Sequence, residues 1–303
     1  MSTHRRLRVS LASAWLAVTL SLLCGPVAFA ASSDDASSLR AKYSELRADL
    51  GNNSFHQPIH IDSAQAGDNL RGDVYAVLPH PFGKFASAMK DPDDWCQVLI
   101  LPFNTKYCHA TQAAGGANLQ VRIGRKADQP ANEAYRIDFA LQPVAAGANY
   151  FESRLSAASG PLGTRDYRIV VSAVPLDSGR TFMHLSYSYG YGSAGRFAMN
   201  MYLSTVGANK VGFSVVGRDE NGQPVYIGGV RGAIERNVMR YYLAIQAHLA
   251  SLAAPAAERN DRRMQAWIDS AERYPRQLHE MDRAAYISMK RGETERQQAL
   301  LQE

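Results

Sequence analysis

The residues of this 303-residue chain that are best suited to chemistry are two cysteines and a run of tyrosines. Cys96 and Cys108 lie twelve positions apart in the stretch PDDWCQVLILPFNTKYCHA. Such a pair can form a redox centre, a set of metal ligands or a disulfide. The spacing is not that of a redox-active C-x-x-C motif, so the choice depends on the compartment in which the protein folds.

The first thirty residues have the pattern of a secretory signal sequence. Residues 5–8 are basic, residues 11–23 are apolar, and residues 28–30 (AFA) give the small-x-small cleavage pattern. We expect cleavage near Ala30 and a periplasmic or secreted mature chain. The apolar run is too short to span a bilayer comfortably.

The signal sequence also decides how the cysteines are interpreted. Cys24 is a poor lipoprotein site, because Leu23 occupies the position where that processing requires a small residue. Cleavage near Ala30 leaves two cysteines in an exported chain, which predicts a disulfide between Cys96 and Cys108.

Composition and charge narrow the classes of function. The chain has 46% hydrophobic and 20% charged residues, which is typical of a globular protein. Removing three arginines with the signal lowers the net charge from +5 to +2, so we expect no nucleic-acid partner. No H-E-x-x-H motif or clustered His and Cys spacing is present, and we expect no metal site and no cofactor.

The tyrosines lie in the segment HLSYSYGYG, residues 184–192. In a strand, Tyr187, Tyr189 and Tyr191 share one face and His184 lies on the other, so we expect His184 to be exposed rather than catalytic. If the tyrosine face points inward, it offers apolar rings with hydroxyl groups, which suits an apolar ligand with a few polar atoms. Core aromatic residues with hydroxyls bonded to backbone or water would give the same pattern.

Other polar residues favour structural roles. His80 precedes a proline at a strand end, and no G-x-S-x-G motif is present to supply a nucleophile. Arg231, Glu235 and Arg236 begin a long helix, where we expect a solvated face with Glu235 near the positive end of the helix dipole. Alternatively, an arginine there could bind an anionic head group at a cavity mouth.

The pattern of apolar residues predicts the elements that must position these groups. Two strands (58–64 and 70–80) are followed by two short helices (82–89 and from 91), and a period-two pattern then runs from residue 104 for about a hundred residues. A helix (194–207), a hairpin around DENG, a long amphipathic helix (232–252) and surface helices after residue 258 complete the chain.

This order of elements predicts a curved antiparallel sheet whose apolar face is covered by the long helix. The segment DVYAVLPHPFGKFASAMKDPDDWCQVL resembles the opening of START-related (SRPBCC, helix-grip) domains, and GGVRGAIERNVMRYYLAIQAHLASL resembles their closing helix. The resemblance implies an α+β helix-grip domain over residues 58–253. Residues 31–57 would form an N-terminal arm and residues 258–303 a helical extension, which the minimal domain lacks.

The resemblance also implies a hydrophobic cavity between sheet and helix. We expect ligand contacts from seven aromatic residues: Tyr75, Phe139, Tyr167, Tyr187, Tyr189, Tyr191 and Tyr241. The expected function is a periplasmic binding or carrier protein, not an enzyme, for a lipid or other hydrophobic small molecule. The alternatives are a cyclase- or hydrolase-like enzyme of the same fold and a protein-interaction module that uses residues 258–303. Transient membrane contact also stays open.

Overall fold

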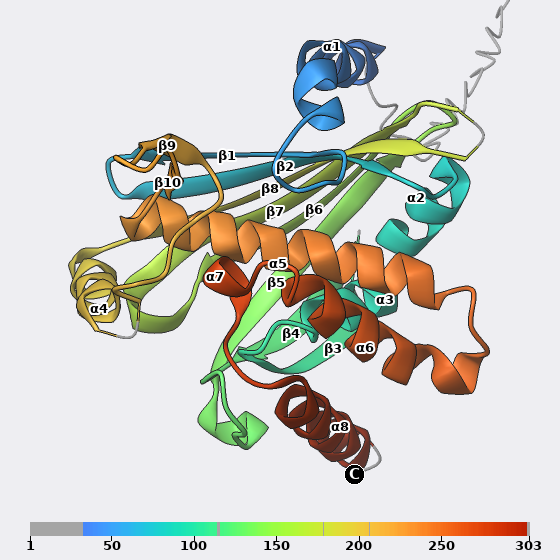
Figure 1. Cartoon of the computed structure of the whole chain (residues 1–303). Helices are drawn as coiled ribbons and strands as arrows, with labels where there is room; N and C mark the ends of the chain where they lie inside the picture. Colours follow the sequence, from blue (N-terminus) through green and yellow to red (C-terminus); the bar gives the residue numbers. More distant parts are fainter. Residues whose placement is uncertain (1–32, 114–115, 178, 206, 302–303) are drawn as a thin grey trace, which may run out of the picture.

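The computed structural model describes residues 33–113, 116–177, 179–205 and 207–301, so the signal-sequence prediction lies outside the described residues. An eight-stranded antiparallel sheet curves around the long helix α5 (Gly229–Ser251) in the order β1-β2-β8-β7-β6-β5-β4-β3 (Figure 1). The strands are β1 (Ile59–Ala66), β2 (Asn69–Leu78), β3 (Thr105–Ala113), β4 (Gly116–Ile123), β5 (Tyr135–Ala146), β6 (Phe151–Ser159), β7 (Thr164–Pro175) and β8 (Thr181–Tyr191). The predicted helix-grip architecture is therefore confirmed.

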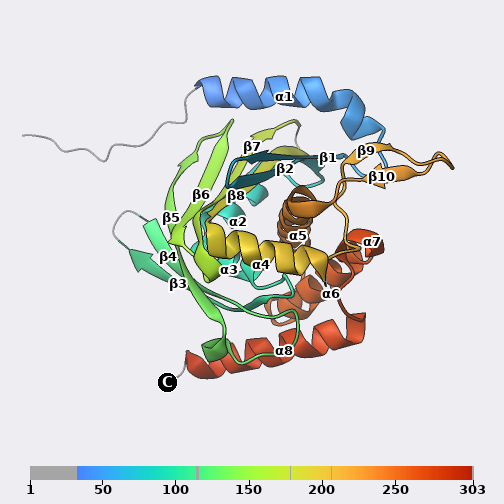
Figure 2. The same ribbon diagram turned by 90° about the vertical axis from the view of Figure 1, so that its left-hand side faces the viewer.

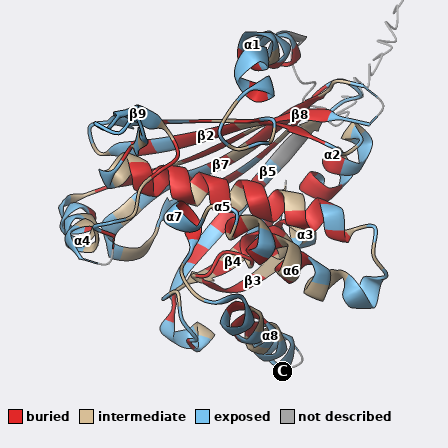
Figure 3. Ribbon diagram, viewed as in Figure 1, coloured by how far each residue is buried: buried red, intermediate tan, exposed pale blue. Residues whose placement is uncertain are grey.

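Helix α5 is buried along most of its length, because it is enclosed between the sheet and the helix α6 (Arg259–Ala271) (Figures 1 and 3). Val238 and Tyr242 have no exposed surface. Gly72 of β2 allows the sheet to approach closely, since a Cβ there would lie 3.2 Å from the carbonyl oxygen of Ile234. In the described part of the chain, no helix combines the length and the apolar character needed to cross a membrane.

Two short helices close one end of the sheet: α2 (Phe82–Lys90) and α3 (Pro92–Leu99). The carboxylate of Asp91 accepts hydrogen bonds from two amides in the first turn of α3, and Pro92 fits that turn because it lacks an N–H group. The buried Trp95 donates its indole N–H to the carbonyl of Met89 at 2.8 Å and contacts Ser153 Oγ of β6 at 3.1 Å. Trp95 thus joins both helices to the sheet.

The predicted disulfide is confirmed. Cys96 of α3 and Cys108 of β3 are bonded, with their Cα atoms 5.2 Å apart. Closing a loop of this length contributes about 3 kcal/mol in the chain-entropy model. The disulfide therefore holds the short helices against the strand that begins the meander.

The predicted N-terminal arm contains the helix α1 (Ser33–Gly51), which packs on the outer face of the sheet, away from α5 (Figure 2). Leu39, Leu46 and Leu50 belong to one apolar cluster with Val174 and Phe182 of the strands. A sheet with apolar side chains on both faces needs a cover on each of them.

The C-terminal extension packs against the domain. It contains α6, α7 (Pro275–Leu278) and α8 (Arg283–Leu300). The buried Trp267 of α6 donates a hydrogen bond to the carbonyl of Arg240 in α5, and the buried Tyr286 of α8 donates one to the carbonyl of Leu101. Trp267 and Tyr286, the two large aromatic residues of these contacts, are thus used within the molecule.

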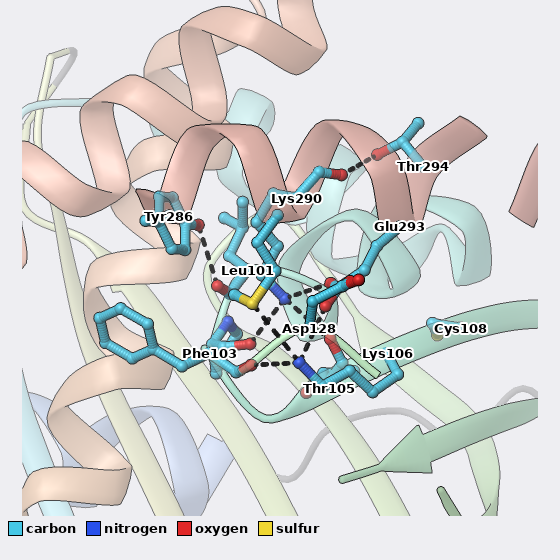
Figure 4. Close-up of polar contacts among 12 residues, drawn as sticks. Leu101, Phe103, Thr105, Lys106, Cys108, Asp128, Tyr286, Lys290, Glu293 and Thr294 are labelled. Carbon is cyan, nitrogen blue, oxygen red and sulfur yellow. Dashed lines mark hydrogen bonds and ion pairs between the residues drawn. The ribbon is translucent and has the colours of Figure 1, made fainter. Parts of the chain in front are cut away.

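A buried cluster of Lys106, Lys290 and Glu293, here called the anchor cluster, attaches α8 to the start of β3 (Figure 4). Lys106 Nζ lies 2.8 Å from Glu293 Oε1, and Lys290 Nζ lies 2.8 Å from Glu293 Oε2. Each ammonium group also donates to two backbone carbonyls. Every ammonium proton therefore has an oxygen acceptor.

Between β8 and α5 the chain forms a helix and a small hairpin. Helix α4 (Ser193–Ser204) lies across one end of the space between sheet and α5 (Figure 2). Strands β9 (Val215–Arg218) and β10 (Pro224–Tyr226) form a separate two-stranded sheet around the predicted DENG turn.

Candidate ligand-binding cavity

A cavity of about 320 Å³ lies between the inner face of the sheet and α5. Strands β4, β5, β7 and β8 supply one wall and α5 supplies the opposite wall. Residues 99–105, which follow α3, close one side, and α4 with the turn 161–163 closes another. The volume is at the lower end of the range of about 300–1,000 Å³ that is typical of small-molecule pockets.

Six of the seven predicted ligand-contact residues line this cavity: Phe139, Tyr167, Tyr187, Tyr189, Tyr191 and Tyr241. The rings of Tyr167 and Tyr189 are stacked, with centroids 5.4 Å apart. Tyr187 of the sheet meets Tyr241 of α5 edge to face at 5.2 Å. The structure thus brings the strand tyrosines and the helix tyrosine together, as predicted.

Tyr75 is the exception, and its prediction as a cavity residue is wrong. It pairs with His184 across β2 and β8, so both side chains lie on the outer face under α1. The Tyr75 ring stacks on the His184 ring at a centroid distance of 4.2 Å, and His184 Nε2 lies 2.7 Å from Asp73 Oδ1. His184 is on the predicted face but is half-buried rather than exposed.

The tyrosine hydroxyls differ in how they are satisfied. Tyr167 donates to Thr164 Oγ1 at 2.7 Å, and Tyr191 accepts from Gln65 at 3.1 Å. The hydroxyls of Tyr187, Tyr189 and Tyr241 make no hydrogen bond to any residue that the structure describes. Burial raises the pKa of all three phenols, so they are neutral at physiological pH and can donate to a bound molecule.

Three basic residues, here called the cation cluster, lie in the wall beside the aromatic residues: Lys126, Arg236 and Arg240. Arg236 and Arg240 are four positions apart on α5 and therefore share a face of the helix. Arg236 Nη2 lies 3.3 Å from the hydroxyl of Tyr202 in α4, and the Lys126 ammonium lies 5.7 Å from the centre of the Tyr202 ring.

Glu280, which lies between α7 and α8, is the acidic partner of this cluster. Its Oε1 atom is 2.6 Å from Lys126 Nζ and 2.6 Å from Arg240 Nη2. Burial by itself would raise the pKa of Glu280, but Arg240 and Lys126 together hold it below its usual value. The Nε atom of Arg240 is buried without a hydrogen-bond partner among the described residues.

The expectation of a solvated face at the start of α5 is wrong for two of its three residues. Glu235 is fully buried and accepts hydrogen bonds from Ser63 Oγ and from the backbone amides of residues 213 and 214. Arg236 is 1% exposed. Only Arg231 keeps partial exposure, with its guanidinium bonded to Ser63.

In the described part of the chain, no group of three or more His, Cys, Asp or Glu side chains could hold a metal ion. The backbone carbonyl of His80 accepts a hydrogen bond from Thr181 Oγ1 at 2.8 Å, and His80 does not line the cavity.

No family model and no curated protein matches the sequence. Among solved structures, the chain is similar to an aromatase/cyclase from a Streptomyces species (12% identity, 71% of this chain and 96% of that chain covered, TM-score 0.32). It is also similar to a START superfamily protein from Mycobacterium smegmatis (13% identity, 45% of this chain and 88% of that chain covered, TM-score 0.31). A third similar structure is norcoclaurine synthase from Thalictrum flavum (11% identity, 49% of this chain and 79% of that chain covered, TM-score 0.32). The helix-grip fold of this chain is established by its own strand order and by α5.

Proposed function

We propose that this protein is an exported binding or carrier protein for a lipid or another hydrophobic small molecule, held between the sheet and α5. The observation that carries the proposal is the cavity lined by seven aromatic residues, three of which have hydroxyls without a hydrogen-bond partner among the described residues. Apolar walls with a few convergent polar groups are typical of small-molecule sites.

The state of the phenols is suited to binding a molecule with hydrogen-bond acceptors. Tyr187, Tyr189 and Tyr241 have raised pKa values because they are buried, and a neutral phenol is a hydrogen-bond donor rather than a base. If the protein is instead an enzyme of this fold, Tyr189→Phe would abolish turnover of the bound molecule. A carrier would lose affinity alone.

The packing of the C-terminal helices supports a carrier over an interaction module. Trp267 of α6 and Tyr286 of α8 have no exposed surface. An extension that uses its apolar residues internally has fewer of them to offer a partner.

Helix α4 is our candidate for the lid through which the ligand enters. Ala198 and Met199 face the cavity, whereas Phe197 and Met201 of the same helix are 68% and 52% exposed. Exposed apolar residues next to a cavity mouth would suit transient contact with a membrane that donates or receives the ligand.

Mass spectrometry of organic extracts tests the proposal on full-length protein exported and purified under mild conditions. We expect a hydrophobic molecule in near-stoichiometric amount. Ala198→Phe, which fills the cavity from α4, should remove most of it, because the new ring occupies the ligand's space. Asn200→Phe adds the same ring to the exposed side of α4 and should leave the ligand in place. Extracts that are empty, or equally loaded in both variants, would contradict the proposal.

A further inference from the structure

The wall of the cavity carries three basic residues, and we propose that the protein selects ligands with an anionic group, a carboxylate or a phosphate, which the cation cluster binds. This inference rests on the proposed function, because it names the chemical class of the molecule held in the same cavity. It adds that the ligand is an amphiphile with a defined orientation.

The charges in the wall are unbalanced. Lys126, Arg236 and Arg240 all line the cavity, and none of the described lining residues is acidic. Glu280 lies behind them and meets two of the three cations through the same oxygen, Oε1. The cluster therefore has three positive charges against one negative charge in a largely buried site, and Arg236 has no carboxylate partner among the described residues. Isolated buried charge is unfavourable, so an anion that enters the site would be stabilised there.

Some hydrogen-bond donors of the cation cluster also lack a good acceptor among the described residues. Arg240 is 5% exposed, and its Nε–H group has no partner among the described residues. Its Nη1 atom reaches only Asn237 Oδ1, at 3.4 Å. A guanidinium group has five donors in a planar fork that matches the two oxygens of a carboxylate or phosphate. Arg240 thus lines the cavity with more donors than the described residues supply with acceptors.

The protonation of Lys126 agrees with this excess of positive charge. Burial and the neighbouring Arg240 lower the pKa of Lys126 to about 8, although Glu280 opposes the shift. An added anion would favour the charged amine, and the charged amine would in turn favour the anion.

The positions of the aromatic residues give the orientation. Arg236, Arg240 and Tyr241 all belong to α5, and Tyr241 meets Tyr187 of the sheet. An acidic head at the arginines therefore places the apolar body of the ligand between the helix and the tyrosines of β8. A neutral hydrophobic molecule would use the aromatic walls and leave the arginine donors unsatisfied.

Calorimetric titration of ligand-free, full-length protein with matched compounds tests the inference. The acids are decanoate, monodecyl phosphate and 4-biphenylcarboxylate, and the neutral counterparts are decanol and 4-biphenylmethanol. We expect an acid to bind at least about tenfold more tightly than its neutral counterpart, because charge-assisted hydrogen bonds are about twice as strong as neutral ones. The order of decanoate and monodecyl phosphate tells which anion the site prefers.

Lys126→Gln should reduce the preference for the acid, and Arg240→Gln should abolish it. Arg125→Gln is the matched control, since it removes one positive charge from the adjacent residue, whose side chain is 70% exposed. Because Arg240 is buried, a thermal unfolding curve must first show that the Arg240→Gln variant is folded. If that variant does not fold, the Lys126→Gln variant provides the test, since Lys126 lies in a loop. Equal binding of acids and neutral compounds would overturn this inference and leave the proposed function standing. If neither kind binds, both fail.

Discussion

The anchor cluster and the cation cluster both join the C-terminal extension to the main domain through one carboxylate, but their donors have different surroundings. In the anchor cluster, each ammonium group donates to two backbone carbonyls and to one oxygen of Glu293. In the cation cluster, two basic side chains share one oxygen of Glu280, and Arg240 keeps an unpartnered Nε. Every donor of the first cluster has an acceptor, whereas the second cluster lines the cavity and has more donors than acceptors among the described residues.

This difference separates a structural role from a binding role. A buried ion pair with every donor satisfied has no donor left for a ligand, and its removal lowers the stability of the fold. A cluster with unsatisfied donors beside a cavity stabilises the fold less than a fully satisfied one, and its free donors can bind a ligand. Substitution of Glu293 should therefore act mainly on the stability of the fold, and substitution of Glu280 should act mainly on ligand affinity.

The largest effect is expected for Glu293→Gln. This change leaves the ammonium groups of Lys106 and Lys290 in the interior without a counter-charge, so the free energy of unfolding should fall by about 3–5 kcal/mol. Urea unfolding followed by circular dichroism measures the loss. The exposed Glu295 on the same helix is the control, and its change to Gln should alter stability by less than about 0.5 kcal/mol. A loss below about 1 kcal/mol for Glu293→Gln would refute the structural role of the anchor cluster.

Glu280→Gln should act mainly on binding. Glu280 competes with an anionic ligand for Lys126 and Arg240, so its neutralisation should tighten decanoate binding by about threefold to tenfold. Isothermal titration at pH 7 measures this change. Glu272→Gln removes a carboxylate that pairs with His279 on the surface and should leave the affinity unchanged. Weaker binding in the Glu280 variant would show that this carboxylate positions the arginine instead of competing with the ligand.

Much of the fold was predictable from the sequence because its main signals are local. Period-two alternation identified the strands of the meander, and the apolar stripe from Ile234 to Leu252 identified α5. The disulfide followed from the count of cysteines and the signal pattern. The position of α1 on the outer face was not predicted, because no local pattern tells which of two apolar faces of a sheet a helix will cover.

The cavity was predictable only in part. Alternation within β8 placed its tyrosines correctly, and the same reasoning applied to β2 would have excluded Tyr75, since Leu70, Val74 and Ala76 occupy the inner face. Arg236 was one of the arginines considered for an anionic head group, but the rest of the cation cluster was missed for a different reason. Its members come from a loop and from α5, and their carboxylate comes from the extension, so only tertiary packing brings them together. The spacing of the two arginines, four positions apart, was the one local signal.

The smallest expected effect is a pH dependence of ligand affinity that comes from Lys126. Its pKa is lowered to about 8 in the free protein, where Glu280, Arg240 and Arg236 surround it, and a bound anion should raise that pKa. Affinity for decanoate should therefore be constant below about pH 8 and fall by about threefold between pH 8 and 10, because one charge-assisted contact is lost while the arginines keep theirs. Titrations across this range measure the slope. Lys126→Gln should make the affinity independent of pH over the same interval, whereas Arg125→Gln should preserve the decline. A decline that persists without Lys126 would assign the titration to another group and remove this lysine from the cation cluster.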